Sequence, residues 1–224
     1  MMRTLLVVGA VVVVALAAFA LWFGALRNVQ TPSYTVLQKN GAFELRGYPE
    51  MVVAEVEREG DREQAVRRGF SPLARYIFAE DRPGEKIAMT APVTQQRVDD
   101  PKANARWQVR FVMPAQYEQG ELPEPASEDV RLRSVAARKM AAVRFNGNPT
   151  DSLMEEKRAE LLEWMNDKDL EPVGPPIHAY YDPPFMPSFL RRNEVLFEAS
   201  ADGSDSAVSS ASGRFRQRIG RDFR

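Results

Sequence analysis

Lys86-Ile87-Ala88-Met89-Thr90-Ala91-Pro92-Val93-Thr94 combines a strand pattern with a strand-stopping proline in nine residues, and the other elements are best placed relative to it. Apolar side chains at positions 87, 89 and 91 alternate with the side chains at 88 and 90, which is the period of two of a β-strand. Pro92 has no N–H to donate to a sheet, so it belongs at a strand end, a bulge or an edge. We therefore predict a strand over residues 86–94 that ends in irregular backbone.

The same order of elements occurs twice along the chain. Strand patterns in the first half cover residues 43–46, 51–56, 86–94 and 106–113, and those in the second half cover 130–133, 139–143, 172–181 and 193–199. Leu45 matches Leu132 and Arg46 matches Arg133 at one fixed offset. A helix follows the second strand of each half, so the sequence predicts strand-strand-helix-strand-strand, twice.

Each predicted helix begins at a recognisable N-terminal signal. Asp61 can cap the first helix, with Gln64 three residues later. The second helix is predicted to begin near residues 150–152, with Ser152 and Glu155 as its capping box. The bounds of both helices follow from these signals and from their apolar stripes.

These elements indicate an α+β fold. One half alone would leave a sheet with one bare face, whereas two halves joined edge to edge share a core. We predict a pseudo-twofold distorted antiparallel β-barrel of about eight strands with two helices, preceded by one N-terminal transmembrane helix. The barrel domain is expected over residues 34–199, with halves at about 34–113 and 129–199.

Composition excludes several classes of function. The formal net charge is −1, which gives no electrostatic reason to expect a nucleic-acid partner. Cysteine is absent, so disulfides and thiolate metal sites are excluded, and the one histidine excludes a His-rich zinc site. We find no phosphate-binding glycine loop and no hydrolase nucleophile motif, and we predict neither a metal site nor catalytic residues.

The N-terminal region predicts a membrane anchor. After residues 1–3, residues 4–26 carry no charge, which is long enough to span a bilayer, and residues 27–33 form a short polar linker. Two alternatives stay open: a signal peptide cleaved after Ala18-Phe19-Ala20, or a buried core helix. Arg3 favours a cytoplasmic N-terminus, so the domain is expected outside the cytoplasm, in the periplasm, either anchored or secreted there after cleavage.

The C-terminal residues 200–224 predict a disordered basic tail. Its first part is Ser, Ala, Gly and Asp, and its last eleven residues contain five arginines. Such a tail is commonly only solvated, and the functional alternative is contact with anionic lipid or nucleic acid. An anchor at the other end of the chain makes anionic lipid the better of the two functional partners.

Two motifs resemble the signature of the SOUL family of haem-binding proteins. The first is the Lys86 to Thr94 stretch, and the second is Tyr181-Asp182-Pro183-Pro184 followed by Arg191-Arg192-Asn193-Glu194-Val195. The resemblance covers about residues 31–199. It implies a haem or other tetrapyrrole ligand and a pseudo-twofold barrel with two helices, which is similar to the effector-binding domains of some transcription regulators.

Haem binding needs an apolar slot and cations for the two propionates. Phe70 and Ala74 lie one helical turn apart, and Arg67 and Arg75 project on nearly the same side. By the resemblance, these arginines match propionate partners, although a solvated helix face explains them as well. The proline-rich loop is predicted to form the opposite wall of the slot, with the side chains of Phe185, Met186 and Phe189. The alternative is that these three side chains pack back onto the barrel.

A strong axial ligand to iron is not expected. Some family members have a histidine in the first hairpin, where this sequence has Gly47. His178 is a weak axial candidate, since a lone histidine in a strand is more often hydrogen-bonded within the sheet. Met89 is a soft ligand candidate or a core residue. We therefore expect haem as a reversibly bound ligand, held by apolar contact and charge.

Two other functions stay open. Some relatives of the regulator-type domain resemble hydrolases that use a buried carboxylate and a tyrosine, and the candidate residues for such a pair here are Glu44, Glu55, Tyr48 and Tyr76. The third alternative is an interaction domain without haem. For Arg191 to Glu194 we predict a structural role, in which arginines pair with acids across the barrel. The sequence thus favours a membrane-tethered tetrapyrrole-binding protein over an enzyme.

Overall fold

The computed structural model describes residues 29–98 and 105–201. The predicted anchor at residues 4–26 and almost all of the predicted basic tail lie outside these ranges. Within the described residues, no helix combines the length and the apolar character needed to cross a membrane.

The fold is α+β, as predicted, with nine strands and two α-helices among the described residues. Two short 3-10 helices, η1 (Gln119–Glu121) and η2 (Ser188–Leu190), lie in connections. The helices are α2 (Arg62–Ile77) and α3 (Asp151–Asn166). The strands are β1 (Thr35–Asn40), β2 (Phe43–Tyr48), β3 (Met51–Glu59), β4 (Val93–Arg97), β5 (Arg106–Val112), β6 (Arg131–Val135), β7 (Arg138–Asn146), β8 (Leu170–Tyr180) and β9 (Arg192–Ala201).

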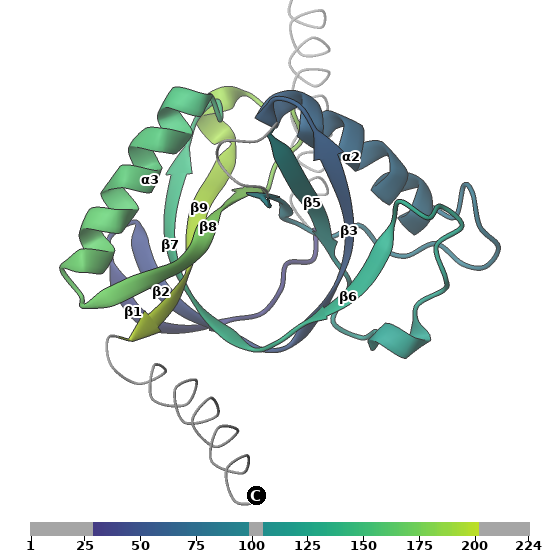
Figure 1. Ribbon diagram of the computed structural model, residues 1–224, viewed down its shortest axis with the longest axis horizontal. Helices are drawn as coiled ribbons and strands as arrows, with labels where there is room; N and C mark the ends of the chain where they lie inside the picture. The colour runs from purple at the N-terminus through teal and green to yellow at the C-terminus, as the bar shows by residue number, and fades with distance from the viewer. Residues whose placement is uncertain (1–28, 99–104, 202–224) are drawn as a thin grey trace, which may run out of the picture.

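All nine strands form one antiparallel sheet in the order β1-β2-β7-β9-β8-β4-β5-β3-β6. Strands β2, β3, β4 and β5 of the first half correspond to β6, β7, β8 and β9 of the second half. When each strand is exchanged for its counterpart, the order β2-β7-β9-β8-β4-β5-β3-β6 becomes the same order read in reverse. The repeat seen in the sequence is therefore a twofold arrangement of the strands. The sheet curls into a barrel-like layer, and α2 and α3 lie outside the curl, one on each half (Figure 1).

The strand predicted at residues 86–94 is wrong in its bounds. The backbone from Lys86 to Pro92 is irregular, and β4 begins only at Val93. Ile87 N–H donates to the carbonyl of Ile77 at 2.7 Å, and Ala91 N–H donates to Gln30 at 2.8 Å. Because these groups bond to a helix end and to the N-terminal segment, they are not free for a sheet neighbour. The alternation reflects burial of Ile87 under α2 without a strand.

The ninth strand, β1, was not predicted. All six of its residues are exposed, so no alternation of apolar and polar residues marks it in the sequence. It pairs only with β2, through a tight turn in which Gly41 has a φ of 57°. An edge strand with exposed side chains, held by main-chain pairing and by the ion pair between Lys39 and Glu44, leaves little pattern to detect.

Both helices are capped by a side chain at their start. Asp61 accepts a hydrogen bond from Gln64 N–H at 2.7 Å, which confirms the first predicted cap. The second cap is Thr150, whose hydroxyl accepts from Leu153 N–H at 3.3 Å, so the predicted capping box at Ser152 and Glu155 is wrong. Both residues stand inside the first turns of α3, because the helix begins at Asp151.

Each helix covers strands from both halves of the chain. Under α2, Leu73 and Ile77 pack against β3 and β5 and also against Val130 and Leu132 of the second half. Under α3, Trp164 stacks on Phe43 of the first half, with ring centroids 5.7 Å apart. The first strand of each half thus completes the core beneath the helix of the other, so neither half has a complete core alone. A third apolar cluster lies on the inner face of the sheet, around Met140 and Leu196.

Candidate functional site

One flank of α2 carries a partly exposed aromatic ring. Phe70 is 40% exposed, and its ring meets Phe111 of β5 edge to face with centroids 5.2 Å apart. Ala74, one turn further along, is half-buried. The neighbouring residue Gly69 brings α2 close to the same strand, and a Cβ atom there would stand 2.7 Å from Val109 Cγ2. This close approach fixes the helix on the sheet and so fixes the direction in which Phe70 points.

Two arginines accompany Phe70 on α2, and neither is firmly engaged. The Arg67 side chain is 70% exposed, and its Nη2 lies 3.4 Å from Glu63 Oε2. The Arg75 side chain is 53% exposed, and its Nε lies 4.0 Å from Asp81 Oδ2. Ion pairs this exposed contribute little free energy, so both guanidinium groups can exchange their partner for another anion. We call Arg67, Phe70, Ala74 and Arg75 the α2 face.

The proline-rich loop between β8 and β9 exposes two further aromatic rings. Phe185 is 65% and Phe189 73% exposed, whereas Met186 is only 3% exposed and belongs to the interior. The loop is fastened from two sides. Arg191 Nε donates to Met186 O at 2.7 Å, and Asn146 Nδ2 donates to Phe189 O at 3.1 Å. The two phenylalanines are therefore presented by a fixed backbone next to the end of β7.

Met89 and His178, the two axial candidates, are both enclosed. Met89 is partly buried and packs against the apolar cluster beneath α2. His178 is a buried sheet residue of β8, paired with Gln95 of β4 and Val195 of β9, and its Nδ1 has no hydrogen-bond partner. Burial, together with the positive charge of Arg62, lowers the pKa of His178 from 6.5 to about 4, so the imidazole is neutral near pH 7. Among the described residues, no group of three or more His, Cys, Asp or Glu could hold a metal ion.

The inner face of the sheet holds a buried network of charges. Arg46 of β2 donates to Glu194 of β9 through Nη1 at 2.6 Å and Nη2 at 3.1 Å, and both side chains are almost fully buried. Arg192 Nη2 at 2.7 Å and Tyr181 Oη at 2.9 Å also donate to Glu194. Burial raises the pKa of Glu194, but the hydrogen bonds and charge of Arg46 outweigh it, and the pKa lies below its ordinary value.

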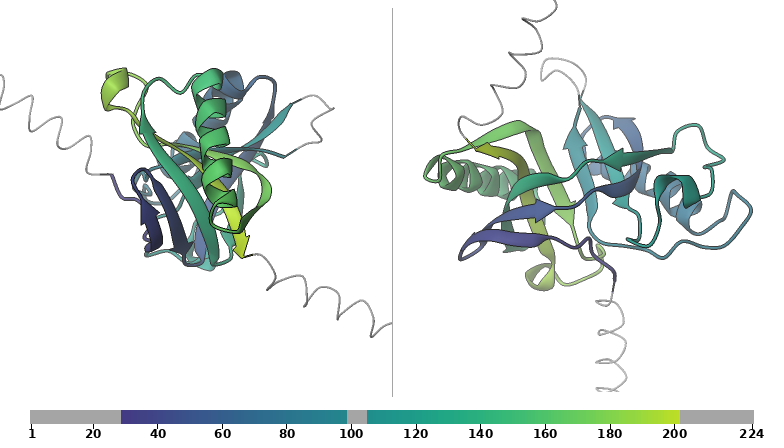
Figure 2. Two further views of the ribbon diagram at one scale, coloured as in Figure 1. Left: turned by 90° about the vertical axis from the view of Figure 1, so that its left-hand side faces the viewer. Right: turned by 90° about the horizontal axis from the view of Figure 1, so that it is seen from below.

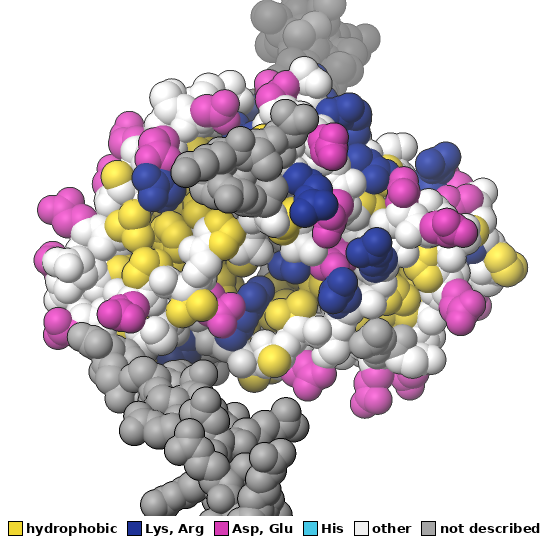
Figure 3. Space-filling model, in the orientation of Figure 1, with side chains coloured by type: hydrophobic (Ala, Val, Ile, Leu, Met, Phe, Trp, Pro, Cys, Tyr) yellow, Lys and Arg dark blue, Asp and Glu magenta, His cyan; other side chains and the backbone are white. Residues whose placement is uncertain are grey.

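The structural role predicted for residues 191–194 holds in part: Glu194 pairs across the sheet with Arg46, whereas Arg192 pairs with Glu194 of its own strand and Arg191 donates to Met186 O and to Asn148 Oδ1. The importance of Arg46 was missed. Its repeat partner Arg133 gave the only hint, and Arg133 also bonds a buried carboxylate, Glu55, at 2.5 Å. Figure 3, which looks into the curl of the sheet, shows Lys and Arg side chains near the middle of this face and most Asp and Glu side chains around it.

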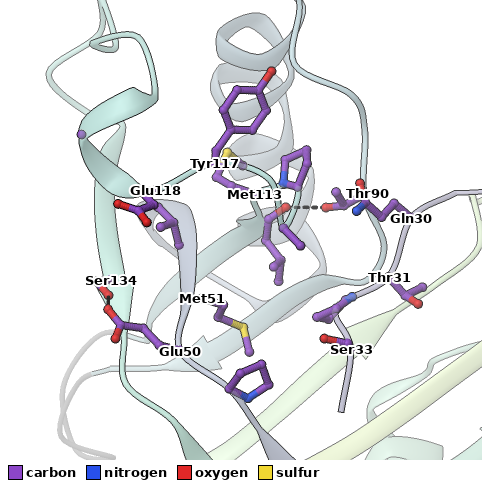
Figure 4. A pocket seen from close by; sticks show the side chains of 17 residues that line it. Gln30, Thr31, Ser33, Glu50, Met51, Thr90, Met113, Tyr117, Glu118 and Ser134 are labelled. Carbon is purple, nitrogen blue, oxygen red and sulfur yellow. Dashed lines mark hydrogen bonds between the residues drawn. The ribbon is translucent and has the colours of Figure 1, made fainter.

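A separate cavity of about 690 Å³ opens at the rim of the sheet. We call it the rim cavity. Its walls are the N-terminal segment 30–33, the β2–β3 turn, the ends of β3 and β5, and the connection that follows β5 (Figure 4). A smaller cavity of about 60 Å³ lies inside the curl and shares Pro32, Met51 and Val112 with it. None of the residues of the α2 face lines either cavity.

Comparison with known proteins supplies a family and a fold. The family model described as "SOUL heme-binding protein" matches residues 29–198. No curated protein matches this chain. The C-terminal domain of EcmrR is 16% identical with a TM-score of 0.56, over 75% of this chain and 98% of that one. A hydrolase from Listeria innocua is 13% identical with a TM-score of 0.52, over 73% of this chain and 94% of that one. At these identities, both structures indicate the fold alone.

Proposed function

The chain belongs to the SOUL heme-binding protein family, and we propose that it binds haem or a related tetrapyrrole reversibly on the α2 face, without a strong protein ligand to iron. The observation that carries this proposal is the exposure of Arg67 and Arg75 beside the half-exposed ring of Phe70. A porphyrin offers an apolar ring and two carboxylates on one edge. The α2 face offers an apolar surface and two weakly paired cations, and so fits both parts.

Charge favours the α2 face over the rim cavity as the haem site. The charged residues that line the rim cavity are Glu50 and Glu118, with no lysine or arginine among the lining residues. Two propionates placed there would meet like charges, whereas on α2 they meet Arg67 and Arg75. Phe185 and Phe189 supply further exposed apolar surface that could extend the contact with the macrocycle.

Weak axial ligation follows from where the candidates lie. His178 is buried beside Arg62, and Met89 packs beneath α2. Haem iron would supply redox and ligand-exchange chemistry when bound, but binding would rest on the ring and propionates. The protein should therefore take up metal-free protoporphyrin about as well as haemin.

The test is an absorbance titration with haemin and with metal-free protoporphyrin. We expect both to bind, and we expect Arg67→Ala with Arg75→Ala to weaken both about tenfold or more, because two charge-assisted contacts are lost. The matched control is Lys157→Ala with Arg158→Ala on α3, which removes the same charge from a helix and should leave binding unchanged. Equal affinity in both double variants would disprove the assignment to the α2 face.

A hydrolase remains the alternative, and a specific feature keeps it in view: the contact between Tyr181 Oη and the buried Glu194. The lowered pKa of Glu194 and its bonds to two arginines make it a weak general base. The four residues named from the sequence do not form such a pair. Glu44 and Glu55 are ion-paired with arginines, and Tyr76 donates to Pro123 O at 2.8 Å beneath α2. Ester turnover lost in Glu194→Gln would favour the enzyme.

A further inference from the structure

The rim cavity is large enough for a ligand of its own. Its volume of about 690 Å³ lies within the range of roughly 300 to 1,000 Å³ that is usual for small-molecule sites. It is separate from the α2 face and plays no part in the proposed haem site. The cavity therefore needs its own account.

The lining combines apolar side chains with acceptors on two sides. Met51, Val52 and Met113 contribute apolar surface from the ends of β3 and β5. Figure 4 shows Glu50, Glu118 and Ser134 along one side of the cavity, and Gln30, Thr31 and Ser33 on the other. The floor is thus apolar and the walls are polar, which suits a ligand with an apolar body and a polar head.

The charge of the lining decides the class of ligand. Glu50 and Glu118 are its charged residues, and both are carboxylates. The Ser134 hydroxyl donates to Glu50 and holds that carboxylate at the wall. Tyr117 adds an aromatic ring, to whose face a cation is attracted. An anionic ligand gains nothing from these groups, whereas an organic cation gains from each of them.

We propose that the rim cavity binds an amphipathic organic cation, with an apolar body against Met51 and Met113 and an ammonium or guanidinium group near Glu50 and Glu118. This site is distinct from the proposed haem site and has the opposite charge preference. The protein would carry two separate ligand sites, one lined by arginines outside the sheet and one lined by carboxylates at its rim.

The test compares three naphthalene probes that differ only in the head group: trimethylammonium, hydroxyl and sulfonate. Calorimetric titration of the full chain should show the cation binding about tenfold more tightly than the neutral probe, and the sulfonate more weakly still. Raising the salt from about 50 mM to about 500 mM should reduce the preference for the cation, because both carboxylates are solvent-exposed.

Three variants locate the site. Glu50→Gln with Glu118→Gln should remove the preference for the cation while leaving the neutral probe bound, since the apolar floor is unchanged. Glu124→Gln with Glu128→Gln, two exposed acids of the same connection outside the lining, is the matched control and should preserve the preference. Ala115→Trp adds an indole at an exposed lining position and should abolish binding of all the probes.

Each contrary result overturns the proposal. The rim cavity is not a cation site if the three probes bind alike, if none binds, or if the cation preference survives in the Glu50 and Glu118 variant. Binding unaffected by Ala115→Trp would place the probe elsewhere. Haemin titration of the same variants separates the two sites: an unchanged haemin affinity supports two sites, whereas loss of haemin binding in Ala115→Trp would assign the cavity to haem.

Discussion

Replacing Glu194 by glutamine tests the buried charge network on the inner face. The carboxylate is fully buried and receives hydrogen bonds from Arg46, Arg192 and Tyr181. Glutamine has the same shape but no charge, and its NH₂ group faces guanidinium donors. Arg46, itself almost fully buried, would keep only Glu44 as a charged partner, at 2.8 Å.

The expected cost is large for a single isosteric change. Removing one partner of a buried ion pair typically costs about 3 to 5 kcal/mol, because the remaining charge stays buried without compensation. In a domain of this size, such a loss lowers the melting temperature by roughly 10 °C. The loss in unfolding free energy is measured by urea unfolding followed by tryptophan fluorescence. Glu198→Gln on the same strand is the control, since its contact with Arg138 at 3.1 Å is partly exposed and should be worth less than about 1 kcal/mol.

Two further measurements separate charge from shape. Arg46→Met together with Glu194→Leu should recover most of the lost stability, because no uncompensated charge remains between the two positions. The pKa of Glu194 lies below 4.5 in the folded protein, so its contribution is present above pH 4.5 and is lost as the pH falls through the folded pKa. If Glu194→Gln lost no more stability than Glu198→Gln at neutral pH, the buried network would not stabilise the fold in this way.

Three more predictions concern α2, the single histidine and the N-terminal segment. Gly69→Ala should destabilise the protein by about 1 to 3 kcal/mol in urea unfolding, because its Cβ would lie 2.7 Å from Val109 Cγ2, whereas Ser71→Ala on the exposed side should cost nothing. His178 should titrate near pH 4 when followed by proton NMR. The free energy of unfolding should fall by about 3 kcal/mol in total as the pH drops from 6.5 to 4, because only the unfolded chain takes up the proton in that range. A titration midpoint near pH 6.5 would contradict the burial of His178. Residues 4–26 should hold the full chain in the membrane fraction, and a chain beginning at residue 29 should be released from it.

The order of strand and helix types could be read from the sequence with little error. Period-two alternation marked β5, and an Asp61 cap marked the start of α2, because both signals lie within a few neighbouring residues. The resemblance drawn from two motifs gave the family that the comparison then confirmed. Residues 86–92 misled the prediction, because burial beneath α2 produces the same alternation as a strand.

The candidate haem residues could also be grouped from helical spacing, since Arg67, Phe70, Ala74 and Arg75 belong to one helix. The exposed fraction of each side chain could not be predicted from the sequence, because it depends on which elements pack nearby. Met186 and Phe189 lie three residues apart in one loop, yet one is buried and the other is open to solvent.

The repeat, the two helices and the family can all be predicted from local sequence patterns. The packing of the folded chain was needed to show that Leu45 lies under α3 and Leu132 under α2, and that Arg46 meets Glu194. It also placed Glu50 and Glu118 in the lining of one cavity at the rim. Alternation along a strand specifies which residues share a face, but not which distant strand becomes the neighbour. That choice is made by packing the two halves against each other.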